Sequence, residues 1–242
     1  MVEGVGDYLG PYLLGPNDVN QGIYTGDARE LARVIPDESV DLIFTDPVYQ
    51  NIDDYRWLAE TAARVLKPDS ACLVWSGVKW LGECITAMAA LQYRWTLIWW
   101  QTGKMNWPWD YIYYKWTPII WMELGKTKPA RPIQDIRQEL STANSGNHRW
   151  GKLSSVISYY LGAFAPTDSV ILDPFTGGGT MAAVCKMLGR RWLAFEIDTD
   201  TANDARRRVQ MTQAPLFVMQ EEQMTMELEP QMSGGKDRTC GG

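Results

Sequence analysis

The feature that most constrains this chain is a regular alternation of two kinds of segment, which begins at Ile23 and runs to Met211. Apolar runs of strand length alternate with segments whose apolar residues recur with the period of a helix. This alternation is typical of an α/β fold, in which helices cover a mostly parallel sheet. Strands are expected at 40–45, 71–75, 95–100, 118–122, 170–172 and 192–197, with 95–100 and 118–122 paired antiparallel, and helices at 55–66, 156–164, 179–188 and 201–211.

Two stretches break this pattern. Residues 125–147 contain two prolines, several basic residues and a polar run, and are interpreted as a mobile loop or small insertion. From residue 220 the chain is rich in Glu and Met and ends in SGGKDRTCGG, which indicates a disordered tail over 220–242. The remaining residues, 1–219, are expected to form one domain with a short insertion within about 101–147.

A glycine-rich turn follows the strand expected at 170–172. The sequence Asp173-Pro174-Phe175-Thr176-Gly177-Gly178-Gly179 leads from that strand into a helix, so the backbone must turn sharply at a point where a ligand can approach closely. Glu196 ends the next strand, where an acidic side chain of a doubly wound sheet accepts the two hydroxyls of a ribose. The carboxylate of Asp173 could accept hydrogen bonds from an ammonium group. Together these features predict a nucleoside-containing ligand held by Asp173, Gly177, Gly179 and Glu196, the alternative being a tight turn without a ligand.

A second motif, Asp46-Pro47-Val48-Tyr49, follows the strand at 40–45. It resembles the catalytic motif of the DNA amino-methyltransferases, [DNS]-P-P-[YFW]. The resemblance implies that the Asp46 carboxylate and the Pro47 carbonyl hold the two hydrogens of an exocyclic amine, whose conjugated nitrogen is otherwise a poor nucleophile. It also implies that Tyr49 stacks on a base swung out of double-stranded DNA.

The resemblance extends over roughly residues 23–211. With the catalytic turn first and the glycine-rich turn last, the order is similar to that of the circularly permuted β group, so it implies a Rossmann-like methyltransferase fold with S-adenosylmethionine as cofactor. In that family the equivalents of Asp27 and Phe175 contact the cofactor. The chain departs from the family at Val48, which replaces the second proline, and at Thr117, which stands where Glu is common. Residues 148–153 match the family's H-P-x-x-K-P stretch without its two prolines.

The charge pattern bears on nucleic-acid binding. The net charge is −6, yet basic side chains concentrate between residues 104 and 152, so a local basic face is compatible with an acidic protein. Lys104, Asn106 and Lys115 lie among tryptophans and are candidates for DNA contacts, with a solvated surface as the alternative.

Composition narrows the chemistry. One histidine and four scattered cysteines favour neither a metal site nor disulfides, and none of the cysteines follows a proline, as methylation of cytosine carbon-5 would require. Direct in-line transfer is therefore expected. The resemblance implies adenine as the acceptor, because Asp is commonest at the first motif position, here Asp46, among the adenine enzymes of that family. Cytosine-N4 methylation, methylation of an RNA base or a protein amide, and a decayed DNA-binding homologue remain alternatives. No apolar run of membrane-spanning length is present, so a cytoplasmic protein is expected in a bacterial cell or a phage-infected host, where a homodimer is possible.

Overall fold

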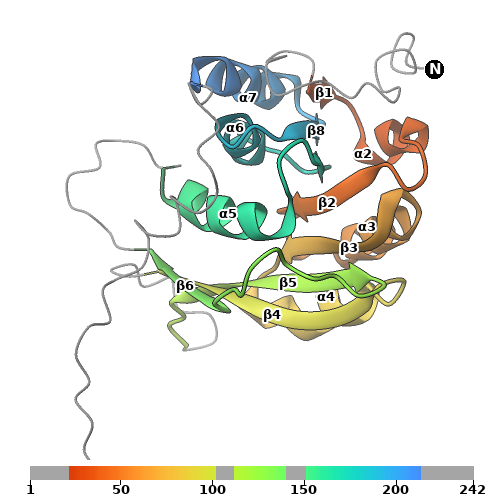
Figure 1. Cartoon of the computed structure of the whole chain (residues 1–242), viewed down its shortest axis with the longest axis vertical. Helices are drawn as coiled ribbons and strands as arrows, with labels where there is room; N and C mark the ends of the chain where they lie inside the picture. The colour runs from red at the N-terminus through yellow and green to blue at the C-terminus, as the bar shows by residue number, and fades with distance from the viewer. Residues whose placement is uncertain (1–21, 102–111, 140–150, 214–242) are drawn as a thin grey trace, which may run out of the picture.

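A single eight-stranded sheet organises the computed structural model, which describes residues 22–101, 112–139 and 151–213 (Figure 1). The order of strands across the sheet is β1-β8-β7-β2-β3-β5-β4-β6. The strands span Ile23–Thr25 (β1), Val40–Thr45 (β2), Leu66–Trp75 (β3), Gln92–Gln101 (β4), Trp116–Leu124 (β5), Ile136–Glu139 (β6), Val170–Asp173 (β7) and Arg191–Glu196 (β8).

Strand direction confirms the mostly parallel sheet with one reversed strand. The pairs β1–β8, β8–β7, β7–β2 and β2–β3 are all parallel. Only β5 among these eight strands runs the other way, and it pairs antiparallel with both β3 and β4. The carboxyl ends of the seven other strands consequently meet at one edge of the sheet, which is where open α/β sheets bind ligands.

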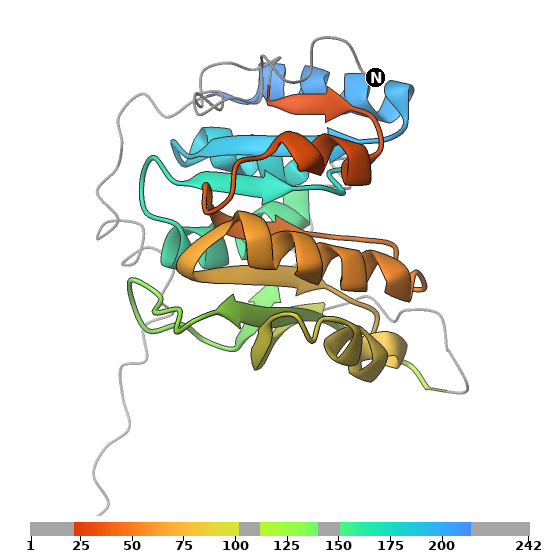
Figure 2. The ribbon, with the colours of Figure 1, turned by 90° about the vertical axis from the view of Figure 1, so that its right-hand side faces the viewer.

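Helices cover both faces of the sheet. On one face α5 (Gly151–Phe164), α6 (Thr180–Met187) and α7 (Thr199–Met211) pack against side chains such as Leu42 and Phe44. On the other face α2 (Ala28–Leu31), α3 (Ile52–Val65) and α4 (Leu81–Ala87) pack against Val40 and Ile43, and these helices lie nearest the viewer in Figure 2. Because β2 is covered on both faces, it is apolar along most of its length, as a central parallel strand must be. Two short 3-10 turns, Ala32–Val34 and Val78–Trp80, complete the described elements.

One prediction from the sequence is wrong. The segment interpreted as a loop within 125–147 contains a strand, β6, which pairs parallel with β4 at the edge of the sheet. The strand is four residues long and three of them are polar, so it lacks the apolar signal of a buried strand. Its partner lies far away in the sequence, so there was no hairpin signal either.

The short elements β1, α2 and α4 were also not expected from the sequence, and the boundaries of the expected elements differ by at most five residues. Helix α3 begins at Ile52, three residues earlier than expected, with Asp53 and Asp54 in its first turn, where acidic side chains favour the positive end of the helix dipole. Among the described residues, no helix has both the length and the apolar character needed to cross a membrane.

Candidate active site

The two predicted motifs lie side by side at the carboxyl edge of the sheet. Strands β2 and β7 are neighbours, so the turn after β2 and the turn after β7 start next to each other. The Thr45 hydroxyl, at the end of β2, donates a 2.6 Å hydrogen bond to the carboxylate of Asp173, at the end of β7. The structure therefore brings Asp46 and Asp173 together, although 127 positions of sequence separate them.

The first turn is closed by its own backbone. The Asn51 amide donates a 2.9 Å hydrogen bond to the Val48 carbonyl, and α3 begins at the next residue. Pro47 is buried, Tyr49 is half-buried, and Val48 is 68% exposed. The ring of Tyr49 packs so closely on Gly77 that a Cβ added there would lie 3.1 Å from it. Tyr49 is thus held between the turn and the end of β3.

Asp46 is the most perturbed carboxyl group of this edge. Solvent reaches its side chain, yet protein surrounds it at longer range, and this burial raises the pKa of Asp46 to about 7. The Tyr49 side chain opposes the increase with a hydrogen bond to the carboxylate, and the nearby Asp173 adds to it. A carboxyl group whose pKa is this close to neutrality at a strand end is typical of a functional site.

The glycine-rich turn uses two of its glycines for different reasons. Gly177 has φ of 50° and a Cβ there would meet nothing within 4 Å, so open space lies beside the backbone. Gly179 has φ of 72°, and a Cβ there would lie 2.8 Å from the Cβ of Ala205. Gly177 therefore leaves room for a ligand, whereas Gly179 allows α6 to pack tightly on α7.

Three acidic residues lie at or just after the ends of three adjacent strands. Glu196, at the end of β8, accepts hydrogen bonds from the amides of Gly177 (3.0 Å) and Asp198 (2.9 Å). Asp27, which follows β1, is exposed and caps α2 by accepting a 2.8 Å hydrogen bond from the Arg29 amide. Asp173 is buried. These acceptors, next to the space at Gly177, suit a ligand with hydroxyl groups and a positive charge.

Phe175 links the glycine-rich turn to α3. Its ring is half-buried and makes a T-shaped contact with Trp57, from α3, with ring centroids 5.8 Å apart. The guanidinium of Arg29 lies over the other ring of this pair, Trp57. The predicted cofactor residues Asp27 and Phe175 thus belong to one connected surface.

Sequence reasoning missed Ile197, which directly follows Glu196. Its side chain is 71% exposed, an unfavourable place for a large aliphatic group unless something covers it. An apolar residue between the acidic end of a strand and the helix cap Asp198 was the available signal.

The predicted DNA-contacting residues are only partly described. Lys104 and Asn106 lie outside the described residues. Lys115 is exposed beside the first residue of β5, and its carbonyl accepts a 2.7 Å hydrogen bond from the Gln101 amide. It therefore sits at the same edge of the sheet as the two turns. Residues 148–150 lie outside the described part of the chain. Residues 151–153 form the start of α5, which begins at Gly151, but their side chains are not described.

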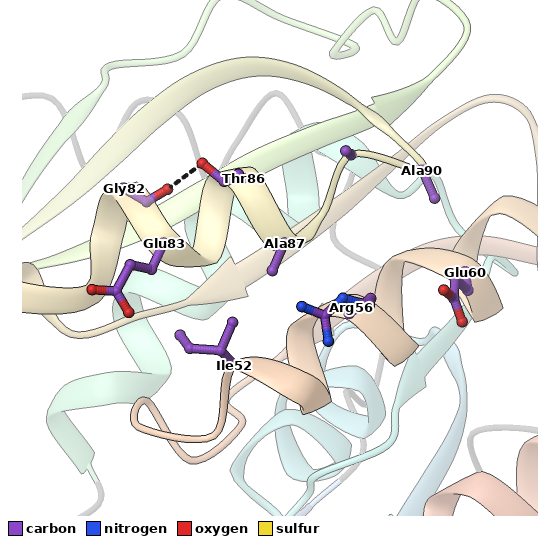
Figure 3. Close-up of a pocket in the computed structure, with 9 residues that line it drawn as sticks. Ile52, Arg56, Glu60, Gly82, Glu83, Thr86, Ala87 and Ala90 are labelled. Carbon is purple, nitrogen blue, oxygen red and sulfur yellow. Dashed lines mark hydrogen bonds between the residues drawn. The ribbon is translucent and has the colours of Figure 1, made fainter.

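A groove between α3 and α4 is separate from this site. It has a volume of about 560 Å³ and none of the sequence-predicted residues line it (Figure 3). Its lining comprises Ile52, Arg56, Glu60, Gly82, Glu83, Thr86, Ala87, Ala89 and Ala90. The groove lies on the face of the sheet that α3 and α4 cover, and no residue of the glycine-rich turn lines it.

Comparison with solved structures defines the class of fold. The M1.HpyAVI–SAM complex superimposes with a TM-score of 0.63 at 20% identity, over 78% of this chain and 98% of that one. The cytosine-N4-specific PvuII DNA methyltransferase superimposes with a TM-score of 0.67 at 18% identity, over 84% and 89%. At these identities the likeness shows the fold alone, which is that of the S-adenosylmethionine-dependent methyltransferases.

Sequence comparison gives the family. The model of the N6/N4 DNA methylases matches residues 40–207, and the chain belongs to this family. The type II methyltransferase M.BamHI of Bacillus amyloliquefaciens is 27% identical over 72% of this chain and 54% of its own length. M.HpaI of Haemophilus parainfluenzae is 20% identical over 79% and 74%. The chain thus spans about half the length of M.BamHI.

The two glycines of the turn make a matched pair for mutation. Gly177→Ala should lower the free energy of unfolding by about 1–2 kcal/mol, because a left-handed backbone strains any Cβ. Gly179→Ala should cost more, about 2–5 kcal/mol, because its Cβ also collides with Ala205. Urea unfolding monitored by circular dichroism measures both, and equal losses would contradict the crowding at Gly179.

Proposed function

We propose that this protein transfers a methyl group from S-adenosylmethionine to the exocyclic amine of adenine in double-stranded DNA. The observation that carries the proposal is the hydrogen bond between Thr45 and Asp173, which sets the Asp46 turn directly beside the glycine-rich turn. A methyl donor held by one turn and an amine held by the other would meet at this edge. Membership of the DNA methylase family supports DNA as the acceptor.

The residues at the glycine-rich turn fit S-adenosylmethionine. Glu196 is oriented by two backbone amides and has further lone pairs for ribose hydroxyls, while Ile197 offers an exposed apolar surface for the adenine ring. Asp173 and Asp27 are the acceptors for the ligand's ammonium and adenine amine. The SAM complex of M1.HpyAVI, which has the same fold, supports this assignment. When bound, the cofactor supplies an electrophilic methyl group: a nitrogen–carbon bond forms as the carbon–sulfur bond breaks.

The catalytic turn prepares the nucleophile. Asp46 and the Pro47 carbonyl accept the two amine hydrogens, which favours the tetrahedral nitrogen, and the nitrogen releases one proton after the transfer. Tyr49 stacks on the target base flipped out of the duplex. No covalent enzyme intermediate is needed, since a nitrogen lone pair attacks directly.

The change from proline to valine at position 48 is compatible with activity. Val48 is exposed and supplies no catalytic atom, while the turn is still closed by the Asn51–Val48 hydrogen bond. A decayed, non-catalytic protein is therefore the less favoured reading. Asp at position 46 favours adenine, and the specificity of the PvuII neighbour makes cytosine-N4 the second candidate.

The wider biological setting follows from the relatives. Two of these relatives are type II methyltransferases, so we infer a role in a restriction–modification system. Residues 1–219 would form the single catalytic domain, with target recognition within about 101–147 and contributions from Lys104, Asn106 and Lys115. We also propose that the protein acts in the cytoplasm and that it forms a homodimer.

Methyl transfer is tested with isotopically labelled S-adenosylmethionine and unmethylated genomic DNA, followed by mass spectrometry of the nucleosides. Labelled N6-methyladenine is expected with the wild-type protein, and at least about a hundredfold less with Asp46→Ala. Labelled N4-methylcytosine would instead show that the acceptor base is cytosine. Background labelling by a folded protein that binds the cofactor would contradict the enzymatic function.

The pH profile tests the state of Asp46. Because the ionised carboxylate is the acceptor and its pKa is raised to about 7, kcat/KM should increase between about pH 6 and 8 and level off above. Tyr49→Phe removes a hydrogen bond that lowers this pKa, so its profile should shift to higher pH. A wild-type profile that is flat across this interval, with circular dichroism showing a folded protein, would exclude Asp46 as the titrating group.

Cofactor affinity tests Ile197. Ile197→Ala should weaken S-adenosylmethionine binding by about 1–2 kcal/mol, or roughly five- to thirtyfold, because apolar surface covered by the adenine is lost. Met211→Ala is the matched control, since Met211 is also highly exposed but lies at the end of α7. Isothermal titration calorimetry measures both; an unchanged affinity for the Ile197 variant would remove this residue from the site.

A further inference from the structure

The segment that leads into β6 is fastened along α5. The Ala130 amide donates a 2.8 Å hydrogen bond to the Ala163 carbonyl. Further along, the Gln134 amide donates to the Tyr159 hydroxyl at 2.8 Å, and the Tyr160 hydroxyl donates to the Gln134 carbonyl at 3.1 Å. In Figure 1, α5 lies close to β6, which is the edge strand of the sheet beside β4. The backbone of this segment is therefore held against α5.

Two arginines of this segment converge on one aromatic ring. The guanidinium carbons of Arg131 and Arg137 lie over the ring of Tyr159, 4.5 Å and 3.9 Å from its centroid. The two guanidinium carbons are therefore separated by no more than the sum of these two distances. Like charges at this separation repel each other, and the ring compensates only part of the repulsion.

Neither guanidinium group forms an ion pair with a carboxylate within the described part of the chain. Arg131 donates to the Tyr159 carbonyl at 3.3 Å, and Arg137 donates to the Gln134 side-chain oxygen at 2.9 Å. The carboxylate of Asp135 instead accepts from Trp95. By contrast, carboxylate partners are present for Arg29, Arg33, Arg56, Arg64 and Arg207. Each of the two guanidinium groups on Tyr159 has five N–H donors, so several are left for an anion.

Strand register places Arg137 at the catalytic edge. Thr45 is level with Thr96 of β4 through Val74 and Ile120. Trp99 follows Thr96 by three positions and pairs with Arg137. Because β4 and β6 run in the same direction as β2, Arg137 lies near the carboxyl edge of the sheet, as Asp46 does.

The distance along this edge suits a DNA duplex. Four strand spacings separate β2 from β6, which is about 19 Å along the sheet. That length corresponds to roughly five or six base pairs. A duplex that lies along this edge with its target base at Asp46 would pass its backbone near Arg137.

We infer that Arg131 and Arg137, held on Tyr159, form a clamp for a backbone phosphate of the bound DNA duplex. This inference rests on the proposed function, because it assumes that DNA is the acceptor. The clamp contributes affinity that is independent of base sequence, whereas discrimination between sequences comes from other residues. A phosphate that contacts both guanidinium groups would also relieve their repulsion, which no carboxylate of the described residues relieves by an ion pair.

The test is the salt dependence of binding to a random-sequence DNA duplex, measured by fluorescence anisotropy. The slope of log K against log salt concentration should decrease in magnitude by about 1–2 in the pair variant R131Q/R137Q. R131K/R137K keeps both charges and loses the planar groups over the ring, so its slope should stay close to that of the wild type. The control R33Q removes an exposed arginine that already pairs with Glu30, and its slope should not change.

A purely structural role gives a different result. If the arginines only fasten the segment to α5, both pair variants will melt at lower temperature and their slopes will equal the wild-type slope, which would overturn the clamp. Should R131Q/R137Q fail to fold, the single variant R137Q applies the same criterion, with an expected decrease of about 1.

The result is separable from the methylation assay. A wild-type protein that methylates DNA while the glutamine variants keep its salt slope would refute the clamp and leave the proposed function intact. A reduced slope in the glutamine variants of a protein that shows no methyl transfer would support the clamp and refute the enzymatic function.

Discussion

The hydrogen bond from Thr45 to Asp173 is the interaction on which the site depends. It joins the ends of β2 and β7, whose turns carry the groups that we propose bind the acceptor and the cofactor. Asp173 is only 5% exposed, so this carboxylate needs partners from the protein. Losing the Thr45 hydroxyl would leave a buried acceptor short of a partner, at a cost of about 1–3 kcal/mol. The same bond therefore stabilises the sheet and sets the spacing of the two turns.

Charge along the carboxyl edge changes sign from one end to the other. Around β1, β8 and β7 the edge carries Asp27, Glu196 and Asp173, and burial raises the pKa of Asp173 to about 6 while the hydroxyl of Thr45 opposes the increase. A cationic ligand would compensate this concentration of acids. Around β6 the edge carries Arg137 instead, whose guanidinium group lies with that of Arg131 over the ring of Tyr159. An acidic protein can thus present one region suited to a cationic cofactor and another suited to an anionic polymer.

Most of the central sheet could be predicted from the sequence, because buried parallel strands are continuous apolar runs. Strand β2 was predicted with its observed boundaries, and the antiparallel pair β4–β5 was expected from two apolar segments with an aromatic loop between them. The edge strand β6 was missed, since an exposed strand needs no apolar pattern. β6 pairs with β4, which is distant in the sequence, so no local pattern reveals this pairing.

The site shows the same division. Asp46, Asp173, Gly177 and Glu196 belong to short motifs at strand ends, so the sequence alone suggested them. Ile197 was missed because an isolated aliphatic residue is usually part of a core, and only its 71% exposure makes it unusual. Arg131 and Arg137 looked like ordinary surface charges. Their relation to Tyr159 arises from the packing of the 126–139 segment on α5, which sequence spacing does not reveal.

The adjacency of the two turns is tested most directly by a crystal structure of the protein with S-adenosylmethionine. The cofactor should lie along Gly177 with its ribose at Glu196, and its methyl group should point toward the carboxylate of Asp46. A cofactor bound elsewhere, for example in the groove between α3 and α4, or a methyl group directed away from Asp46, would contradict the proposed methyl transfer.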